Sequence, residues 1–171
     1  MRPLYRRSIA RLAAWSCALC GAAPAFAATQ VAQVNANVVK PLTITWIQNL
    51  DLGTIILGPG SWSAATVSIS RAGTFACANA NVTCSGPPQV AKYNVTGSNN
   101  MTVRISAPAV TLVNQGDSTK TLTLTPDSPG SIVLTSSGAP GLTFPIGGAI
   151  TVNSTTSSGL YRGTFNVTVD Y

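Results

Sequence analysis

The sequence contains no histidine and no glutamate, and only 8% of its 171 residues are charged. The absence of histidine excludes a Ser-His-Asp triad, a histidine general base and a histidine-ligated metal. The scarcity of Glu, Lys and Arg disfavours a helical bundle, whose surface these residues normally fill. Because 45% of the residues are hydrophobic, disorder is disfavoured as well. The length predicts a single domain.

The carboxylates offer no acid–base pair. Asp117 and Asp127 lie in Gly-, Ser- and Pro-containing stretches typical of turns, and Asp170 falls on the polar side of the final strand-like run. Together with Asp51 they match no recognised calcium loop, and no lysine stands in a motif that could activate a serine. We therefore expect no enzyme, no cofactor and no metal site.

The first 27 residues have the pattern of a secretory signal peptide. Four arginines precede an apolar stretch over 12–23, and Ala25-Phe26-Ala27 supplies small residues before a cleavage site between Ala27 and Ala28. The apolar stretch is too short for a membrane anchor, and no later stretch is long enough to be one. Two minor alternatives stay open: a twin-arginine route, from Arg6-Arg7, and a lipoprotein signal at Cys17-Ala18-Leu19-Cys20, which lacks the usual leucine three positions before the cysteine. We expect export to the periplasm and then to the cell surface.

Removal of residues 1–27 changes the balance of charge and cysteine. The chain from Ala28 onward carries six dispersed basic residues and four aspartates, a net charge of +2, in place of +6 for the whole sequence. Without a basic cluster, nucleic acid is not an expected partner. Of the four cysteines, Cys77 and Cys84 remain. In an exported chain they predict one disulfide that closes a short loop.

The remaining sequence reads as many short strands. Thr, Val, Ile, Ser and Asn alternate between frequent Gly and Pro residues, which is typical of an all-β sandwich or barrel. The shared parity of Trp46 with Leu42 and Ile44 predicts that Trp46 lies in the core, and Trp62 beside a turn is the better exposed aromatic. Gly147-Gly148 predicts a tight turn or a bulge. The expected strands cover 42–46, 52–57, 67–69, 90–96, 101–106, 110–113, 121–125, 132–135, 142–146 and 149–152.

The two ends of this region both alternate. Residues 161–171 predict one long strand that reaches Tyr171 with no further strand after it, and its apolar parity holds Tyr161, Gly163, Phe165, Val167, Val169 and Tyr171. In the segment 28–39 the alternating residues are Val34, Ala36 and Val38. That segment is either a first strand or frayed end of its own domain, or an extended donor for another subunit. The pattern alone favours the former.

Four stretches carry a family resemblance. They are Val38-Val39-Lys40-Pro41-Leu42-Thr43-Ile44, Asp51-Leu52-Gly53-Thr54-Ile55, Gly147-Gly148-Ala149-Ile150-Thr151-Val152 and the run 159–169 with its Gly-x-Tyr-x-Gly-x-Phe-like ending. The sequence resembles a bacterial secreted domain-of-unknown-function family whose members look like fimbrial subunits. It is more distantly similar to spore-coat-protein-U-like and chaperone–usher pilins. Gly159 and Tyr171 keep the twelve-residue spacing of a glycine and a near-terminal tyrosine in such pilins.

The resemblance implies an incomplete immunoglobulin-like sandwich over 40–171 that is completed by a donor strand. Its partners would be copies of itself or related subunits, a periplasmic chaperone and an outer-membrane usher. Val34, Ala36 and Val38 would be the donor side chains, and the apolar residues of 159–171 would line the core or the acceptor groove. The alternative is a self-complete secreted sandwich that acts as a surface coat or a glycan-binding module.

Overall fold

The computed structural model describes residues 28–171, so the predicted signal peptide lies outside the described residues. The chain divides into two units, residues 1–36 and residues 37–171. In the first unit, residues 28–36 form no strand and are exposed. The second unit holds thirteen strands and, within the described part of the chain, there is no helix long and apolar enough to cross a membrane.

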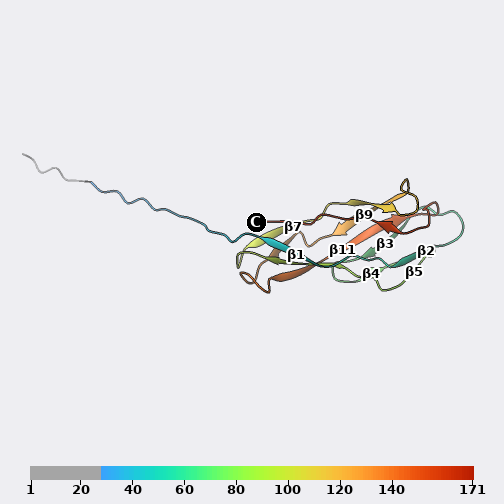
Figure 1. Cartoon of the computed structure of the whole chain (residues 1–171), viewed down its shortest axis with the longest axis horizontal. Helices are drawn as coiled ribbons and strands as arrows, with labels where there is room; N and C mark the ends of the chain where they lie inside the picture. Colours follow the sequence, from blue (N-terminus) through green and yellow to red (C-terminus); the bar gives the residue numbers. More distant parts are fainter. Residues whose placement is uncertain (1–27) are drawn as a thin grey trace, which may run out of the picture. The chain divides into compact units, whose positions relative to one another are not determined.

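The strands of residues 37–171 form an all-β sandwich in which every strand pair is antiparallel (Figure 1). The large sheet has the order β1-β6-β11-β9-β8-β12, with β3 between β11 and β4; a second sheet has the order β10-β7-β13, and β2 pairs with β5. The prediction of an all-β sandwich is confirmed. The bounds are β1 Thr43–Gln48, β2 Thr54–Leu57, β3 Ala65–Ile69, β4 Phe75–Ala76, β5 Val82–Ser85, β6 Ala91–Thr96, β7 Thr102–Ser106, β8 Val110–Asn114, β9 Thr121–Asp127, β10 Ser131–Val133, β11 Leu142–Val152, β12 Tyr161–Arg162 and β13 Thr168–Asp170.

The core has two clusters of buried side chains. The first cluster contains Ala91, Val95, Val103, Ile105, Leu134, Phe144 and Ile146, supplied mainly by β6, β7 and the first half of β11. The second cluster contains Ala65, Val67, Val82, Leu124, Ile150 and Val152. Burial of each large apolar side chain stabilises the fold by roughly 1.5–3 kcal/mol. Both sheets of the sandwich are therefore joined through apolar side chains on their facing sides.

β11 continues through Gly147-Gly148, so the tight turn, one of the two alternatives predicted there, is wrong. Its first half pairs with β6, and its second half pairs with β9 and β3. A Cβ atom at position 147 would lie 2.2 Å from the carbonyl oxygen of Ile69. Glycine is used here because the backbone of β3 approaches the strand closely at the point where β11 changes partners.

The predicted disulfide is confirmed between Cys77, which follows β4, and Cys84 within β5. The two strands β4 and β5 were not among the expected ones, because they are short and lack a sustained apolar alternation. Asp127, expected in a turn, is instead the last residue of β9, where its carboxylate accepts a hydrogen bond from the N–H group of Arg71.

The long C-terminal strand predicted over 161–171 is two short strands. β12 pairs with β8 in the large sheet, whereas β13 pairs with β7 in the second sheet, so the chain crosses between the sheets. A Cβ atom at Gly163 would lie 2.7 Å from the carbonyl oxygen of Thr111, which shows how closely the chain passes β8 before it crosses. The predicted parity survives: from Tyr161 to Tyr171 the apolar side chains are half-buried and the polar ones exposed.

Candidate functional site

The core-facing side of β1 is uncovered. In the β1–β6 register, Ile44 lies opposite Val95 and Trp46 lies opposite Tyr93. Residues directly opposite each other in an antiparallel pair share one face of the sheet, and Val95 is 0% exposed. Ile44 and Trp46 nevertheless remain 37% and 58% exposed. The expectation that Trp46 is buried in the core is therefore wrong, although its predicted parity is right.

A second unpaired edge borders the same core cluster. β13 is the last strand of its sheet, and Val169 lies opposite the buried Ile105 on the core-facing side. Half-buried side chains from this edge pack on the first cluster, and so does Leu42 at the entry to β1. We call the region between the two edges the seam; its residues are Leu42, Ile44 and Trp46 on the β1 side and Phe165, Val167, Val169 and Tyr171 on the C-terminal side.

The side chains of the seam are apolar apart from the hydroxyl of Tyr171 and the indole N–H of Trp46, which donates to the Oδ1 atom of Asn49 at 3.1 Å. β1 carries no charged residue. Exposed edge strands in soluble proteins are commonly protected by lysine, proline or a bulge. β1 has a register shift between Trp46 and Gln48, and the bulged Ile47 is 46% exposed. Of these three protections β1 has the bulge, and the core-facing side chains of Ile44 and Trp46 nevertheless remain apolar and accessible.

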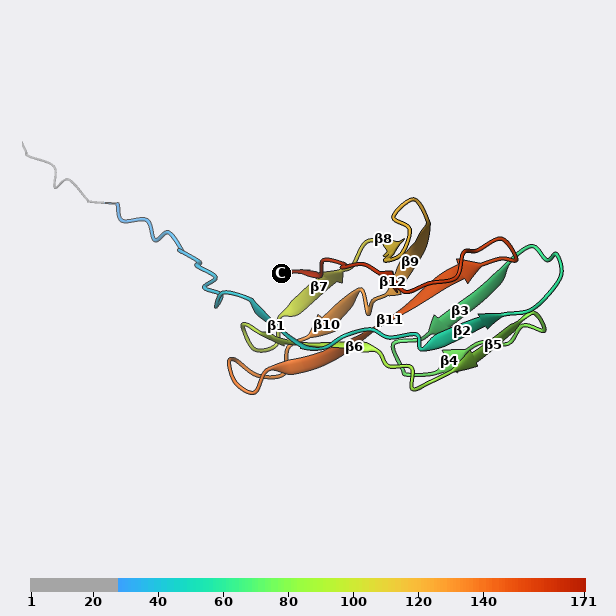
Figure 2. The ribbon, with the colours of Figure 1, turned by 45° about the vertical axis from the view of Figure 1, so that its right-hand side comes forward.

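One end of the seam is closed by a ring of hydrogen bonds among three residues. The hydroxyl of Tyr171 donates to the carbonyl oxygen of Lys40 at 2.6 Å and accepts from the N–H group of Ser98 at 2.7 Å. The N–H group of Lys40 donates to the Oγ atom of Ser98 at 2.6 Å. We call this arrangement the Lys40 clamp. Two views agree that the C-terminal end lies beside the start of β1 (Figure 1, Figure 2).

Gly97 makes room for the clamp. A Cβ atom at this position would lie 2.6 Å from the hydroxyl oxygen of Tyr171, 2.7 Å from Leu42 and 2.8 Å from Leu134. Sequence reasoning named Tyr171 but missed Lys40, Gly97 and Ser98. The Lys40-Pro41 pair is the signal in the sequence that could have pointed to Lys40, because a residue before proline is held in an extended conformation.

The other predicted site residues lie elsewhere. Val34 and Val38 are each 90% exposed, and Ala36 is exposed. Gly159 and Tyr161 belong to the β8–β12 region and not to the seam. The structure thus brings together only the later part of the predicted C-terminal set, from Phe165 to Tyr171, with the start of β1.

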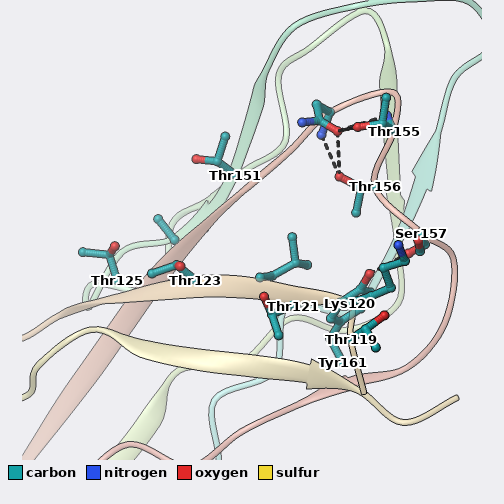
Figure 3. Close-up of a pocket in the computed structure, with 13 residues that line it drawn as sticks. Thr119, Lys120, Thr121, Thr123, Thr125, Thr151, Thr155, Thr156, Ser157 and Tyr161 are labelled. Atoms are coloured by element: carbon teal, nitrogen blue, oxygen red, sulfur yellow. Dashed lines mark hydrogen bonds between the residues drawn. The ribbon is translucent and has the colours of Figure 1, made fainter. Parts of the chain in front are cut away.

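A second surface is an open hollow of about 580 Å³ over β9 and β11 (Figure 3). Hydroxyl groups dominate its lining, and Lys120 is its charged side chain. Tyr161 lies at its rim, with its hydroxyl donating to the carbonyl oxygen of Ser157 at 2.8 Å. The threonines of the lining are Thr119, Thr121, Thr123, Thr125, Thr151, Thr155 and Thr156. Such a surface suits a neutral or weakly acidic polyhydroxyl ligand.

Trp62 is not the exposed aromatic that its turn position suggested. Its ring is half-buried against the second core cluster, and its indole N–H donates to the carbonyl oxygen of Gly58 at 3.3 Å. The tryptophan with the larger accessible surface is Trp46, on the seam.

Carboxylates gather nowhere in the described chain. Within residues 28–171 no three His, Cys, Asp or Glu side chains lie together as a metal site would need. Asp117 is a turn residue, as expected: its carboxylate accepts hydrogen bonds from the hydroxyl and the N–H group of Thr119, which lower the pKa of that carboxyl below its usual value. This interaction is local and faces solvent.

Comparison with known proteins gives a family match. A family model described as "Domain of unknown function (DUF4402)" matches residues 42–171, which include β1, both core clusters and the C-terminal side of the seam. No curated protein and no solved structure matches the chain.

Proposed function

The chain belongs to the DUF4402 family, and we propose that it is a non-enzymatic structural subunit of a fimbria-like surface assembly that polymerises by strand addition. The observation that carries the proposal is the exposure of Ile44 and Trp46 on the core-facing side of β1, opposite buried Val95 and half-buried Tyr93. A sandwich that were complete along this edge would cover these side chains.

An added strand would satisfy both edges of the seam. Its N–H and C=O groups would pair with the free edges of β1 and β13, and every second side chain would cover the apolar residues between them. Unpaired edges and exposed apolar surface favour such an association. The driving force is burial of the exposed parts of Ile44 and Trp46 together with the half-buried C-terminal side chains.

The occupant we propose is the segment 28–39 of another copy. Val34, Ala36 and Val38 share one parity, and all three are exposed in the structure. Twelve extended residues span roughly 40 Å. The C-terminal side of the seam, from Phe165 to Tyr171, is seven residues long, so the segment is long enough to cover it. Each subunit then offers one seam and one donor, and such head-to-tail contacts build fibres.

The predicted export signal and the resemblance to pilins are the basis for the proposed route of export and for the proposed assembly partners. The subunit would pass through the periplasm, where a chaperone covers the seam until a donor from the next subunit replaces it at an outer-membrane usher. The assembly would then stand at the cell surface.

The proposal is tested with a variant that lacks residues 28–39 and with the synthetic peptide of that sequence. We expect the variant to be monomeric and to bind the peptide, with a blue shift of Trp46 fluorescence as the seam fills. A peptide with Val34, Ala36 and Val38 replaced by Asn should not bind. The matched control is a peptide with Val31→Asn, which alters an equally exposed valine on the opposite parity.

Two results would overturn the proposal. One is a deletion variant that oligomerises as the chain from Ala28 does. The other is equal binding of the triple-Asn peptide and the Val31→Asn peptide, because alternating apolar side chains are the basis of the recognition.

The hydroxyl-lined hollow favours a second candidate function, binding of a surface glycan. Its threonines and Lys120 could hydrogen-bond sugar hydroxyls or an acidic sugar. Binding of oligosaccharides to the deletion variant, lost on Lys120→Ala with Thr123→Val, would support this function. Absence of binding across neutral and acidic oligosaccharides would remove it, with no consequence for the seam.

A further inference from the structure

We infer that the Lys40 clamp prevents the chain from filling its own seam and so directs its donor segment to another copy. This inference rests on the proposed function. A chain that carries both a donor and an acceptor can close on itself as a monomer or pair with a neighbour. The Lys40 clamp affects which of the two occurs, because it holds the chain at the residue that follows the segment 28–39.

The direction of the chain decides how the segment 28–39 could enter the seam of its own sandwich. β1 runs away from the clamp, whereas the C-terminal residues run toward it and end at Tyr171. For the segment 28–39 to lie in its own seam, the chain must reverse just before β1 and form a hairpin with it. The tightest hairpins use a two-residue turn. In this chain that turn would fall at Lys40 and Pro41.

Pro41 and the Lys40 clamp together block a turn at that position in three ways. Pro41 restricts Lys40 to extended conformations. The N–H group of Lys40 is held by the Oγ atom of Ser98, and its carbonyl oxygen is held by the hydroxyl of Tyr171. A hairpin turn at Lys40 would therefore break both hydrogen bonds and force the residue before a proline out of its preferred region.

A turn placed earlier would consume the donor. A two-residue reversal at 38–39 removes Val38 from the donor strand, and one at 36–37 removes Ala36 as well, so that Val34 alone of the three alternating donor residues remains. Val38 is 90% exposed and Val39 is 42% exposed, so the sandwich does not cover the residues that come just before the clamp. A donor from a neighbouring copy needs no such turn and keeps all three side chains.

The inference is tested with Tyr171→Phe, which removes the hydroxyl of the clamp and keeps the ring on the core cluster. The matched control is Tyr161→Phe, since the hydroxyl of Tyr161 also donates to a backbone carbonyl, that of Ser157, in another part of the sandwich. Ser98→Ala, which removes the acceptor for Lys40, is the second clamp variant. All are made in the chain from Ala28 to Tyr171 and refolded at one concentration.

We expect Tyr171→Phe and Ser98→Ala to increase the ratio of monomer to oligomer by roughly three- to ten-fold, because each variant removes one of the two hydrogen bonds that hold the backbone of Lys40. Sedimentation velocity gives the ratio. Hydrogen exchange of residues 28–39 in the isolated monomer distinguishes a self-filled seam, in which these amides are protected, from an empty one. Tyr161→Phe should leave both readings unchanged.

The inference is overturned if the clamp variants match the control in monomer content, or if their additional monomer shows unprotected amides over 28–39. Failure of the proposed function looks different. In that case the peptide 28–39 does not bind the deletion variant, and the chain with an intact clamp does not oligomerise.

Discussion

Gly159 packs directly against the side chain of Asn114: a Cβ atom at position 159 would lie 2.4 Å from the Nδ2 atom. Asn114 is only 3% exposed and is the buried polar side chain of the described residues. Its Oδ1 atom accepts hydrogen bonds from the N–H groups of Gly116 and Asp117, and its Nδ2 atom donates to the carbonyl oxygen of Ser158. Gly159 and Tyr171 therefore occupy two separate places in the structure. Gly159 lies against this buried amide, and Tyr171 forms part of the Lys40 clamp.

Gly159→Ala should lower the free energy of unfolding by about 2–4 kcal/mol, because the methyl group would clash with a buried amide at a backbone φ of 140°. Urea unfolding measures the change. The matched control is Gly138→Ala, at φ 99° with no atom within 4 Å of the added Cβ, which isolates the backbone cost of about 1 kcal/mol. Equal losses in the two variants would show that contact with Asn114 is unimportant.

Trp46→Ala should separate assembly from stability. Because the side chain is 58% exposed, we expect a loss of less than about 1 kcal/mol in the free energy of unfolding of the monomer. The same variant should weaken binding of the peptide 28–39 about ten-fold, since aromatic side chains that become buried dominate interface energies. Phe144→Ala, at a residue 2% exposed in the first cluster, is the contrasting case and should lower stability by about 3–5 kcal/mol.

Unfolding by urea and fluorescence titration with the peptide give the two quantities. A Trp46→Ala variant that binds the peptide as tightly as the parent would contradict the assignment of Trp46 to the seam. A Trp46→Ala variant that loses as much stability as Phe144→Ala would show that the side chain of Trp46 already packs in the core of the monomer.

The alternation of the sequence predicts which side chains share a face, and the structure agrees even where the burial does not. Trp46 has the parity of Leu42 and Ile44, and Val169 has that of Val167 and Tyr171. Parity is a local property, so it can be read from neighbouring residues. Whether a face is covered depends on a distant strand. For that reason the exposed core side of β1 could not be predicted from its sequence.

The Lys40 clamp shows the same limit. Its hydrogen bonds join residues separated by 131, 73 and 58 positions in the chain. Only the restriction of Lys40 by Pro41 is local. The continuity of β11 through Gly147-Gly148 was missed for a related reason. In the sequence alone two adjacent glycines indicate a turn, whereas in the structure Gly147 is needed because the backbone of Ile69, on another strand, approaches it closely.

Tyr93 should report filling of the seam through its pKa. Burial raises the pKa of this phenol above its usual value, and Tyr93 lies opposite Trp46 in the β1–β6 register. A strand added over Trp46 would bury Tyr93 further, so we expect the peptide 28–39 to raise its pKa again. NMR of the ring carbon bonded to the hydroxyl follows this residue separately from Tyr161 and Tyr171.

The raised pKa has a defined effect on stability. Tyr93 stays protonated in the folded chain at a pH where the unfolded chain has already lost the proton. The stabilisation is therefore complete below pH 10, the usual pKa, and is lost as the pH rises toward the folded value. Tyr93→Phe should remove this part of the alkaline decrease in stability. A pKa unchanged by bound peptide would show that the added strand does not cover Tyr93.

Removal of the disulfide should lower stability without affecting the seam. Cys77 and Cys84 pack on the second core cluster, whereas the seam borders the first cluster and reaches the second through Phe165 alone. In the chain-entropy model a loop of this length contributes about 2.5 kcal/mol. We expect Cys77→Ala with Cys84→Ala to lower the free energy of unfolding by that amount and to leave the affinity for the peptide 28–39 unchanged. A weakened affinity would mean that the two clusters are coupled, and that the strand addition depends on the whole sandwich and not on the two edges of the seam.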